Sequence, residues 1–216
     1  TVKPIPSTLI DFDQGLERRL GDPRLAGAGS DEMREHYAEG RLNGAVANKL
    51  SLCNFATPGL VRAHEWLRLQ APKGLQHLIL ASGRAEACDK TLRSLKYHRR
   101  AAKIVVSLGP VRAGMSTAAA RAMSTPEGDA QNWFGWPTLA DPTRDPERTL
   151  VELKKVLAER GADKILAVAI EPVYLATGRA VPESFWAPLR EVLKAHDVPL
   201  LLVETATGAY RGARGM

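Results

Sequence analysis

The chain has 216 residues, of which 44% are hydrophobic, so it is long enough to form one domain with a substantial core. No apolar run reaches the roughly 18 residues that cross a bilayer, and we expect no membrane partner. The net charge of +6 raises the question of nucleic acid, but no nucleic-acid motif accompanies the basic residues and we expect no such partner. The densest basic cluster, residues 93–103, is interpreted as a solvated helix end.

The cysteines and the first residues bear on the cellular compartment. Cys53 and Cys88 lack the CxxC spacing of redox and metal motifs, and two lone cysteines suit a reducing environment. The opening sequence TVKPIP lacks the charged-then-apolar pattern of a secretory signal. We therefore expect a cytoplasmic protein. We also expect no metal site, because the His and Cys residues have no paired spacing.

The first half of the chain predicts a helix and then a strand. Residues 1–50 are interpreted as an N-terminal segment, and residues 51–216 as one larger domain. The sequence NFATP predicts a helix start, with Thr57 as the cap and Pro58 as the first helical residue. The short apolar run Leu75–Leu80 predicts a β-strand.

A second predicted helix runs from Glu86 to about Arg99 and follows the small residues Ser82 and Gly83. A strand, a turn of small residues and a helix start form the geometry in which backbone N–H groups hold a phosphate. The next predicted strand is Lys103–Leu108.

A long connection then covers residues 113–146. Its Ala-rich first part, Gly114–Met123, predicts a short helix, and its second part reads as an irregular loop. That loop contains the sequence QNWFGWP, which places Trp133, Phe134 and Trp136 close together. Two interpretations stay open: a loop anchored by its aromatic side chains, or a surface that binds a partner or ligand.

The last part of the chain alternates helices and strands. Asp145 and Pro146 predict the start of a helix, and Gly161 predicts its end. Two buried strands follow, Lys164–Val173 and one ending at Glu204, with an amphipathic helix between them. This order predicts an α/β domain with a mostly parallel sheet and helices on both faces. Ligands of such sheets bind at the carboxyl ends of the strands.

The motifs of this last part carry a family resemblance. The first strand ends in the sequence EPV, a Pro-containing loop follows, and the second strand is followed by Thr207 and Gly208. The chain thereby resembles the class III (ornithine- and GABA-type) pyridoxal-phosphate-dependent aminotransferases, in which strands ending Glu-Pro-Val and Asp-Glu-Val-Gln-Thr-Gly occur in this order. The resemblance spans roughly Asn54 to Met216. It implies the large domain of the fold type I enzymes.

The resemblance implies where the phosphate and the ring of the cofactor would bind. The family's phosphate-binding turn matches Ser82 and Gly83, with Arg84 as one inserted residue. The family's ring-stacking aromatic falls on Val111, and the His that follows it falls on Arg112. A valine covers a ring face but does not stack on it as an aromatic does.

The resemblance also implies where the carboxylate that pairs with the ring nitrogen would be. Anchored on Thr207 and Gly208, that position falls on Val203, and a one-residue deletion would instead place Glu204 there. The family's Schiff-base lysine is expected beyond Met216, so no catalytic residue is assigned. The predicted cofactor-binding residues are Ser82, Gly83, Arg84, Val111, Arg112, Glu171, Val203 and Glu204.

These departures lead to three hypotheses. The first is a class III aminotransferase-like protein that is degenerate at its pyridoxal phosphate site, non-catalytic or of altered chemistry, and part of a larger chain or assembly. The family's sheet has two later strands beside the first one, and without them Leu75–Leu80 would lack a neighbour. The second is an active pyridoxal-phosphate-dependent aminotransferase of an amino acid or amine, with its lysine outside this segment. The third is a non-enzymatic scaffold or partner-binding subunit. The family's dimers imply a homodimer, or a partner chain that completes the sheet.

Overall fold

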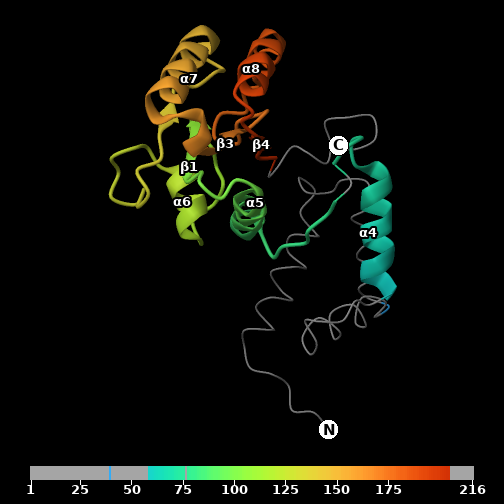
Figure 1. Cartoon of the computed structure of the whole chain (residues 1–216). Coiled ribbons are helices and arrows are strands. Elements are labelled where there is room, and N and C mark those ends of the chain that lie inside the picture. Colours follow the sequence, from blue (N-terminus) through green and yellow to red (C-terminus); the bar gives the residue numbers. More distant parts are fainter. Residues whose placement is uncertain (1–38, 40–57, 76, 205–216) are drawn as a thin grey trace. The chain divides into compact units, whose positions relative to one another are not determined.

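A computed structural model describes residue 39 and residues 58–75 and 77–204 of the chain (Figure 1). The predicted cap Thr57, the pair at 207–208 and all of the predicted N-terminal segment except Glu39 lie outside the described residues. The chain divides into two compact units, Thr1–Leu67 and Arg68–Met216. The elements in chain order are α4 (Pro58–Gln70), α5 (Arg84–His98), β1 (Ile104–Leu108), α6 (Ala118–Ser124), β2 (Thr138–Leu139), α7 (Pro146–Arg160), the 3-10 helix η1 (Ala162–Lys164), β3 (Ile165–Ile170), α8 (Glu183–Ala195) and β4 (Leu200–Leu202).

The second unit is built around a parallel sheet with the strand order β2-β1-β3-β4. All six residues of β3 are buried, as expected for a central strand covered on both faces. Residues 105–107 of β1 pair with 167–169 of β3, and 168–170 of β3 pair with 200–202 of β4. This arrangement confirms the predicted α/β fold with a parallel sheet.

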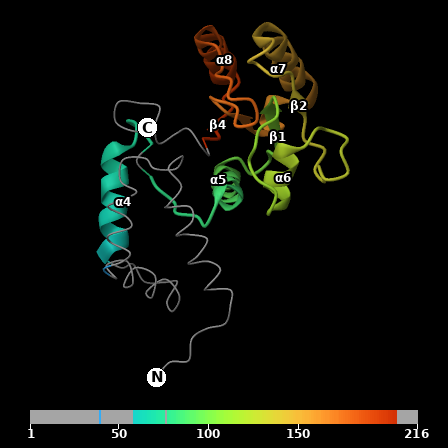
Figure 2. The ribbon, with the colours of Figure 1, turned by 180° about the vertical axis from the view of Figure 1, so that it is seen from behind.

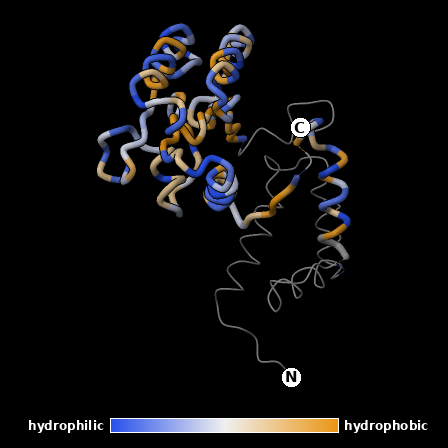
Figure 3. Tube along the Cα trace, viewed as in Figure 1, coloured by the Kyte–Doolittle hydropathy of each residue, from blue (hydrophilic) through white to orange (hydrophobic). Residues whose placement is uncertain are grey.

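Helices cover both faces of this sheet, and each face has its own hydrophobic core (Figures 1 and 2). The first core lies between the sheet and helices α5 and α6, and includes Leu92, Val105 and Met123. The second lies under α7 and α8, and includes Leu153 and Phe185. Figure 3 shows apolar residues concentrated in the strands and polar residues along the outer helix surfaces. Each large apolar side chain buried here contributes about 1.5–3 kcal/mol to folding.

Most predicted boundaries of the helices are confirmed. α4 begins at Pro58, and α7 begins at Pro146 after the cap Asp145, whose Oδ1 accepts a 2.9 Å hydrogen bond from the backbone N–H of Arg148. Gly161 ends α7 with a φ of +82°, a conformation that glycine adopts without a Cβ clash. No helix in the described ranges is long and apolar enough to cross a membrane.

The strand predicted at Leu75–Leu80 is wrong. The described residues of this run, 75 and 77–80, form no strand, and Leu75, Ile79 and Leu80 are exposed. The apolar pattern is typical of a strand, but a strand also needs a neighbour to accept its backbone hydrogen bonds. Within the described residues, no strand lies beside this run.

The long connection is more ordered than the sequence predicts. Its Ala-rich part forms the expected short helix, α6, capped by the Thr117 side chain, which accepts a hydrogen bond from the backbone N–H of Ala120. The part read as irregular contains β2, a two-residue strand parallel to β1. Two residues are too short for a hydrophobic pattern to predict a strand.

Candidate functional site

Two loops meet at the carboxyl edge of the sheet through the buried carboxylate of Glu171. This residue directly follows β3 and is 1% exposed. Its Oε1 accepts a hydrogen bond from the backbone N–H of Arg112, in the loop after β1. Its Oε2 accepts a 2.8 Å bond from the backbone N–H of Leu175, in the loop after β3. Glu171 therefore holds both loops in fixed positions against the strand ends.

A buried tyrosine reinforces the same edge. The Tyr174 hydroxyl donates a hydrogen bond to the backbone carbonyl of Leu108, the last residue of β1. Burial raises the pKa of Tyr174, and the nearby carboxylates of Asp141 and Glu171 raise that pKa further. Tyr174 therefore stays a protonated donor that ties the two strand ends together. No sequence pattern predicts this role, because a Tyr in a loop is compatible with either a buried or an exposed position.

The turn before α5 is closed by a carboxylate of the chain itself. Both the backbone N–H and the hydroxyl of Ser82 donate to Glu86 Oε2, at 2.7 and 2.6 Å. Lys90 Nζ lies 2.9 Å from Glu86 Oε1. The hydrogen bonds from Ser82, then those from Lys90, lower the pKa of Glu86 from 4.5 to about 2. A negative charge therefore already lies at the positive end of this helix.

The loop after β1 lies directly on the first turn of α5. A Cβ added at Gly114 would come within 2.7 Å of the Ala85 Cβ, and Gly114 has a φ of +120°. Both observations require glycine there. The predicted phosphate turn and the predicted ring-stacking loop are therefore neighbours in space, although they are far apart in the sequence.

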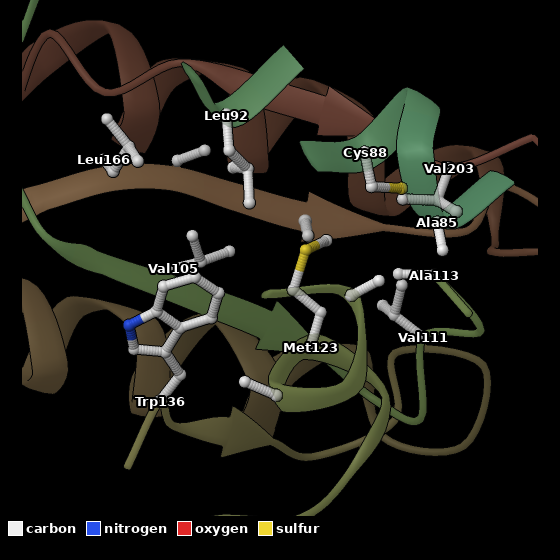
Figure 4. Packing of buried hydrophobic residues seen from close by; sticks show 14 of the residues in the cluster. Ala85, Cys88, Leu92, Val105, Val111, Ala113, Met123, Trp136, Leu166 and Val203 are labelled. Carbon is white, nitrogen blue, oxygen red and sulfur yellow. The ribbon is translucent and has the colours of Figure 1, made fainter. Parts of the chain in front are cut away.

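The two residues at the implied ring positions are part of the first hydrophobic core (Figure 4). Val111 is fully buried, and Val203 is 4% exposed. Both belong to the same cluster as Ala85 and Ala113, which come from the α5 start and from the loop after β1. The structure thus brings the positions implied for the ring partners together, and it surrounds both with apolar side chains.

The remaining predicted site residues are next to members of this cluster in the sequence. Arg84 is the first residue of α5 and is exposed, as is Arg112, whose backbone N–H is held by Glu171. Glu204 is half-buried and follows Val203. The backbone N–H of Val203 donates to the Ile170 carbonyl at 2.9 Å, so the chain stays in register with β3 up to Val203.

The basic cluster at the end of α5 has internal partners. Lys96 Nζ donates to the backbone carbonyl of Ala102 at 2.7 Å. Arg99 donates to the Asp197 carbonyl at 2.6 Å and to the Ala162 carbonyl at 3.3 Å. These two side chains tie the helix end to the amino ends of the strands. The cluster therefore lies at a helix end, as interpreted, but Arg99, whose side chain is 18% exposed, is not solvated.

With this geometry in place, the chain can be compared with known proteins. No model of a known protein family matches it. The putrescine–pyruvate aminotransferase of Pseudomonas aeruginosa is 25% identical over 177 residues, which cover 72% of this chain and 39% of that enzyme.

Solved structures of transaminases have the same fold. A transaminase from the marine bacterium Virgibacillus superposes with a TM-score of 0.68 at 20% identity, over 82% of this chain and 42% of that one. The omega-transaminase of Pseudomonas jessenii, solved in complex with PMP, gives a TM-score of 0.64 at 19% identity, over 75% and 42% of the two chains. An (S)-enantioselective omega-transaminase of Thermomicrobium roseum gives 0.62 at 22% identity, over 74% and 40%.

These comparisons confirm the resemblance inferred from the motifs. The chain resembles an aminotransferase in sequence and the transaminases in fold. It spans about two fifths of the length of these relatives.

The two residues at the positions that the resemblance implies for the ring partners do not fit the pyridine ring of pyridoxal phosphate. The cofactor acts as an electron sink when an acidic side chain pairs with its ring nitrogen. Val203 cannot form this pair, and Val111 cannot stack on the ring as an aromatic does. The first backbone N–H groups of α5 suit an anion, but Glu86 already accepts both donors of Ser82.

Proposed function

We propose that this chain is an aminotransferase-like protein whose pyridoxal phosphate site is degenerate, and that it is non-catalytic or carries out altered chemistry. The observation that carries the proposal is the burial of Val111 and Val203 in one apolar cluster, at the positions implied for the ring-stacking aromatic and the ring-nitrogen carboxylate. A carboxylate placed in that cluster would have to be desolvated among apolar side chains, which is costly. The cluster therefore acts as core packing.

We also propose that the chain works as part of a larger chain or assembly, either as a homodimer or with a partner that completes its sheet. The outer edge of β4 supports this, because no strand in the described part of the chain pairs with it and Leu200 and Leu202 are 39% and 42% exposed. An open edge with apolar side chains is a template for pairing with another strand. We propose a cytoplasmic location on the grounds of the two lone cysteines.

An active aminotransferase of an amino acid or amine, with its lysine outside this segment, is the second candidate. The observation that favours it is Glu204, a half-buried carboxylate one residue beyond Val203 at the carboxyl end of β4. A one-residue shift in the alignment would make it the partner of the ring nitrogen.

Titration with pyridoxal phosphate distinguishes the two candidates. The purified chain is titrated while its tryptophan fluorescence and the cofactor absorbance are recorded. Binding is measured rather than turnover, because the second candidate has its lysine outside this segment. The degenerate-site proposal predicts no saturable change. Saturable binding that disappears in Glu204→Gln, but not in the exposed control Glu159→Gln, would support the second candidate instead.

A further inference from the structure

We propose that the exposed end of α5 binds a single strand of nucleic acid, with cations that contact its phosphates and a base that stacks on Tyr97. We call this surface the Tyr97 patch, and its members are Arg93, Tyr97, His98, Arg100 and Lys103. All five residues are exposed. The patch ends directly before β1, at the amino ends of the strands, whereas the positions implied for the cofactor follow the carboxyl ends. The proposal therefore goes beyond the proposed function and does not depend on it.

The positive charge of the chain is unevenly distributed along the sequence. Residues 90–126 contain eight Lys and Arg residues and no Asp or Glu, so this segment alone carries more positive charge than the net +6 of the whole chain. The pI of the chain is about 9.5. A pI above about 9 with clustered basic residues is the electrostatic footprint of a nucleic-acid-binding protein.

The structure divides the basic cluster of α5 into two groups. Lys96 and Arg99 donate to backbone carbonyls of the chain itself. Arg93, Arg100 and Lys103 are exposed, and no acidic side chain in the described part of the chain forms an ion pair with any of them. Burying unpaired charges is costly, so these three cations favour water or an anionic ligand over an apolar cover.

An exposed aromatic ring lies among these cations. Tyr97 is 71% exposed and lies four residues after Arg93, on the same side of α5. The guanidinium carbon of Arg100 is 5.9 Å from the centroid of the Tyr97 ring. The His98 ring is nearly perpendicular to the Tyr97 ring, with 5.4 Å between the centroids. These contacts restrict the Tyr97 ring, and most of its surface still faces solvent.

Cations beside an exposed ring match a single strand of nucleic acid better than other polyanions. Proteins that bind single strands without sequence preference combine basic side chains along the backbone with aromatic rings on which bases stack. An unpaired base offers a free face to such a ring, whereas the bases of a duplex are stacked on one another. Inorganic polyphosphate would pair with the cations but would make no use of Tyr97.

This proposal departs from the expectation drawn from the sequence, which contains no nucleic-acid-binding motif. The sequence shows that basic residues are dense between 93 and 103. It does not show which of them are already bound inside the chain, or that Arg100 lies over the Tyr97 ring. The arrangement of side chains in the structure therefore carries the proposal.

The test measures the fluorescence anisotropy of fluorescein-labelled oligonucleotides in the presence of the 216-residue chain. The probes are a uridine oligomer and a deoxythymidine oligomer of about 12 nucleotides, within the site sizes of single-strand-binding folds, and a DNA duplex of the same length. The chain should bind the single strands more tightly than the duplex. A preference between the two single strands identifies RNA or DNA as the ligand.

The phosphate contacts should appear in the dependence of binding on salt. Three cations predict that the logarithm of the association constant falls with the logarithm of the salt concentration with a slope of about −2, from about −0.7 per contact with a single strand. Arg93→Gln combined with Arg100→Gln should leave a slope of about −0.7. The control Arg190→Gln removes an exposed cation of α8 and should leave the slope unchanged.

The stacking contact should appear in variants of Tyr97. Tyr97→Ala should weaken binding about fivefold or more, the loss typical of one stacked base, and should leave the salt slope unchanged. Tyr97→Phe keeps the ring and should bind like the unmodified chain. The control Trp133→Ala removes an aromatic side chain that is also 71% exposed and should have no effect.

Several results would overturn the proposal. These are no salt-dependent binding to either single strand, tighter binding to the duplex, or a Tyr97→Ala variant that binds like the unmodified chain. Inorganic polyphosphate that competes as well as the uridine oligomer at equal charge would also overturn it, because polyphosphate has no base to stack. If circular dichroism shows that Tyr97→Ala misfolds, ultraviolet cross-linking of a bromouridine oligomer to the unmodified chain replaces it. The cross-link should then map to the peptide that contains Tyr97, and a cross-link elsewhere would contradict the proposal.

Discussion

At the scale of single residues, side chains at the carboxyl edge of the sheet hold the structure together. Glu171 is a buried carboxylate whose two oxygens each accept a backbone N–H from a different loop. Val203, at the position implied for a catalytic carboxylate, is packed as a core residue. Glu171 thus fixes the loops, whereas the position that the resemblance implies for the ring-nitrogen carboxylate holds an apolar residue.

Replacing Glu171 with Ala should lower the free energy of unfolding by about 3 kcal/mol or more, because two hydrogen bonds to a carboxylate contribute about 1.5–3 kcal/mol each. Glu171→Gln should cost less, since its amide keeps one acceptor oxygen. Urea unfolding followed by circular dichroism measures both. Equal stability of Glu171→Ala and the exposed control Glu159→Ala would contradict the role assigned to Glu171.

Replacing Val203 with Asp restores the acidic residue implied by the family but places it in an apolar cluster. We expect a loss of stability of about 3–5 kcal/mol, the cost of an uncompensated buried charge. The same substitution at Val151, which is exposed on α7, should change stability by only about 0.5 kcal/mol. A Val203→Asp variant as stable as the unmodified chain would mean that this position tolerates a carboxylate. The packing around Val203 would then not be what makes the site degenerate.

At the scale of elements, the start of α5 depends on Glu86. This residue accepts two hydrogen bonds from Ser82 and pairs with Lys90, so one side chain closes the turn and offsets the positive helix end.

The stabilisation by Glu86 should depend on pH. Its pKa in the folded chain is about 2, below the ordinary value of 4.5. The charged carboxylate is therefore more stable in the folded chain than in the unfolded chain. The resulting stability is fully present above about pH 4.5 and is lost as the pH falls towards 2. Glu86→Gln should therefore unfold at a lower temperature than the unmodified chain at neutral pH. This difference in unfolding temperature should shrink at low pH. A difference that stays constant from pH 7 to pH 2 would exclude this origin.

Elements with local signals could be predicted from the sequence, whereas elements that depend on distant partners could not. Asp145, Pro146 and Gly161 set the ends of α7 by local backbone chemistry. The run Leu75–Leu80 has the composition of a strand, but whether it forms one depends on a neighbour elsewhere in the chain. The hydrogen bonds of Trp136 Nε1 to Lys103 and of Tyr174 to Leu108 link segments that no pattern joins, so the sequence does not predict them.

At the scale of the whole molecule, the fold and the site give different information. The parallel sheet with helices on both faces is that of the transaminases. Motif order along the chain was enough to predict this fold and to place the candidate site at the carboxyl ends of the strands. The motifs could not tell whether Val111 and Val203 line an open site or belong to the core, because burial depends on how α5, the β1 loop and β4 pack together.

Within the described residues, no strand pairs with the outer edge of β4. Leu200→Lys should reduce any edge-to-edge association while changing the free energy of unfolding by less than about 0.5 kcal/mol, because its side chain is partly exposed and charged edge residues block strand pairing. Light scattering at matched concentrations, with Val151→Lys on α7 as the control, measures this. Association that is unaffected by Leu200→Lys would argue against a contact at this edge.

Whether the ring site is degenerate is decided by equilibrium binding of pyridoxal phosphate, which does not require the Schiff-base lysine that the resemblance places outside this segment. Binding to the purified chain is measured by equilibrium dialysis, beside the variant Glu204→Gln and the exposed control Glu159→Gln. A degenerate site gives no saturable binding. One saturable site per chain, lost in Glu204→Gln and kept in Glu159→Gln, would show that the ring site is intact.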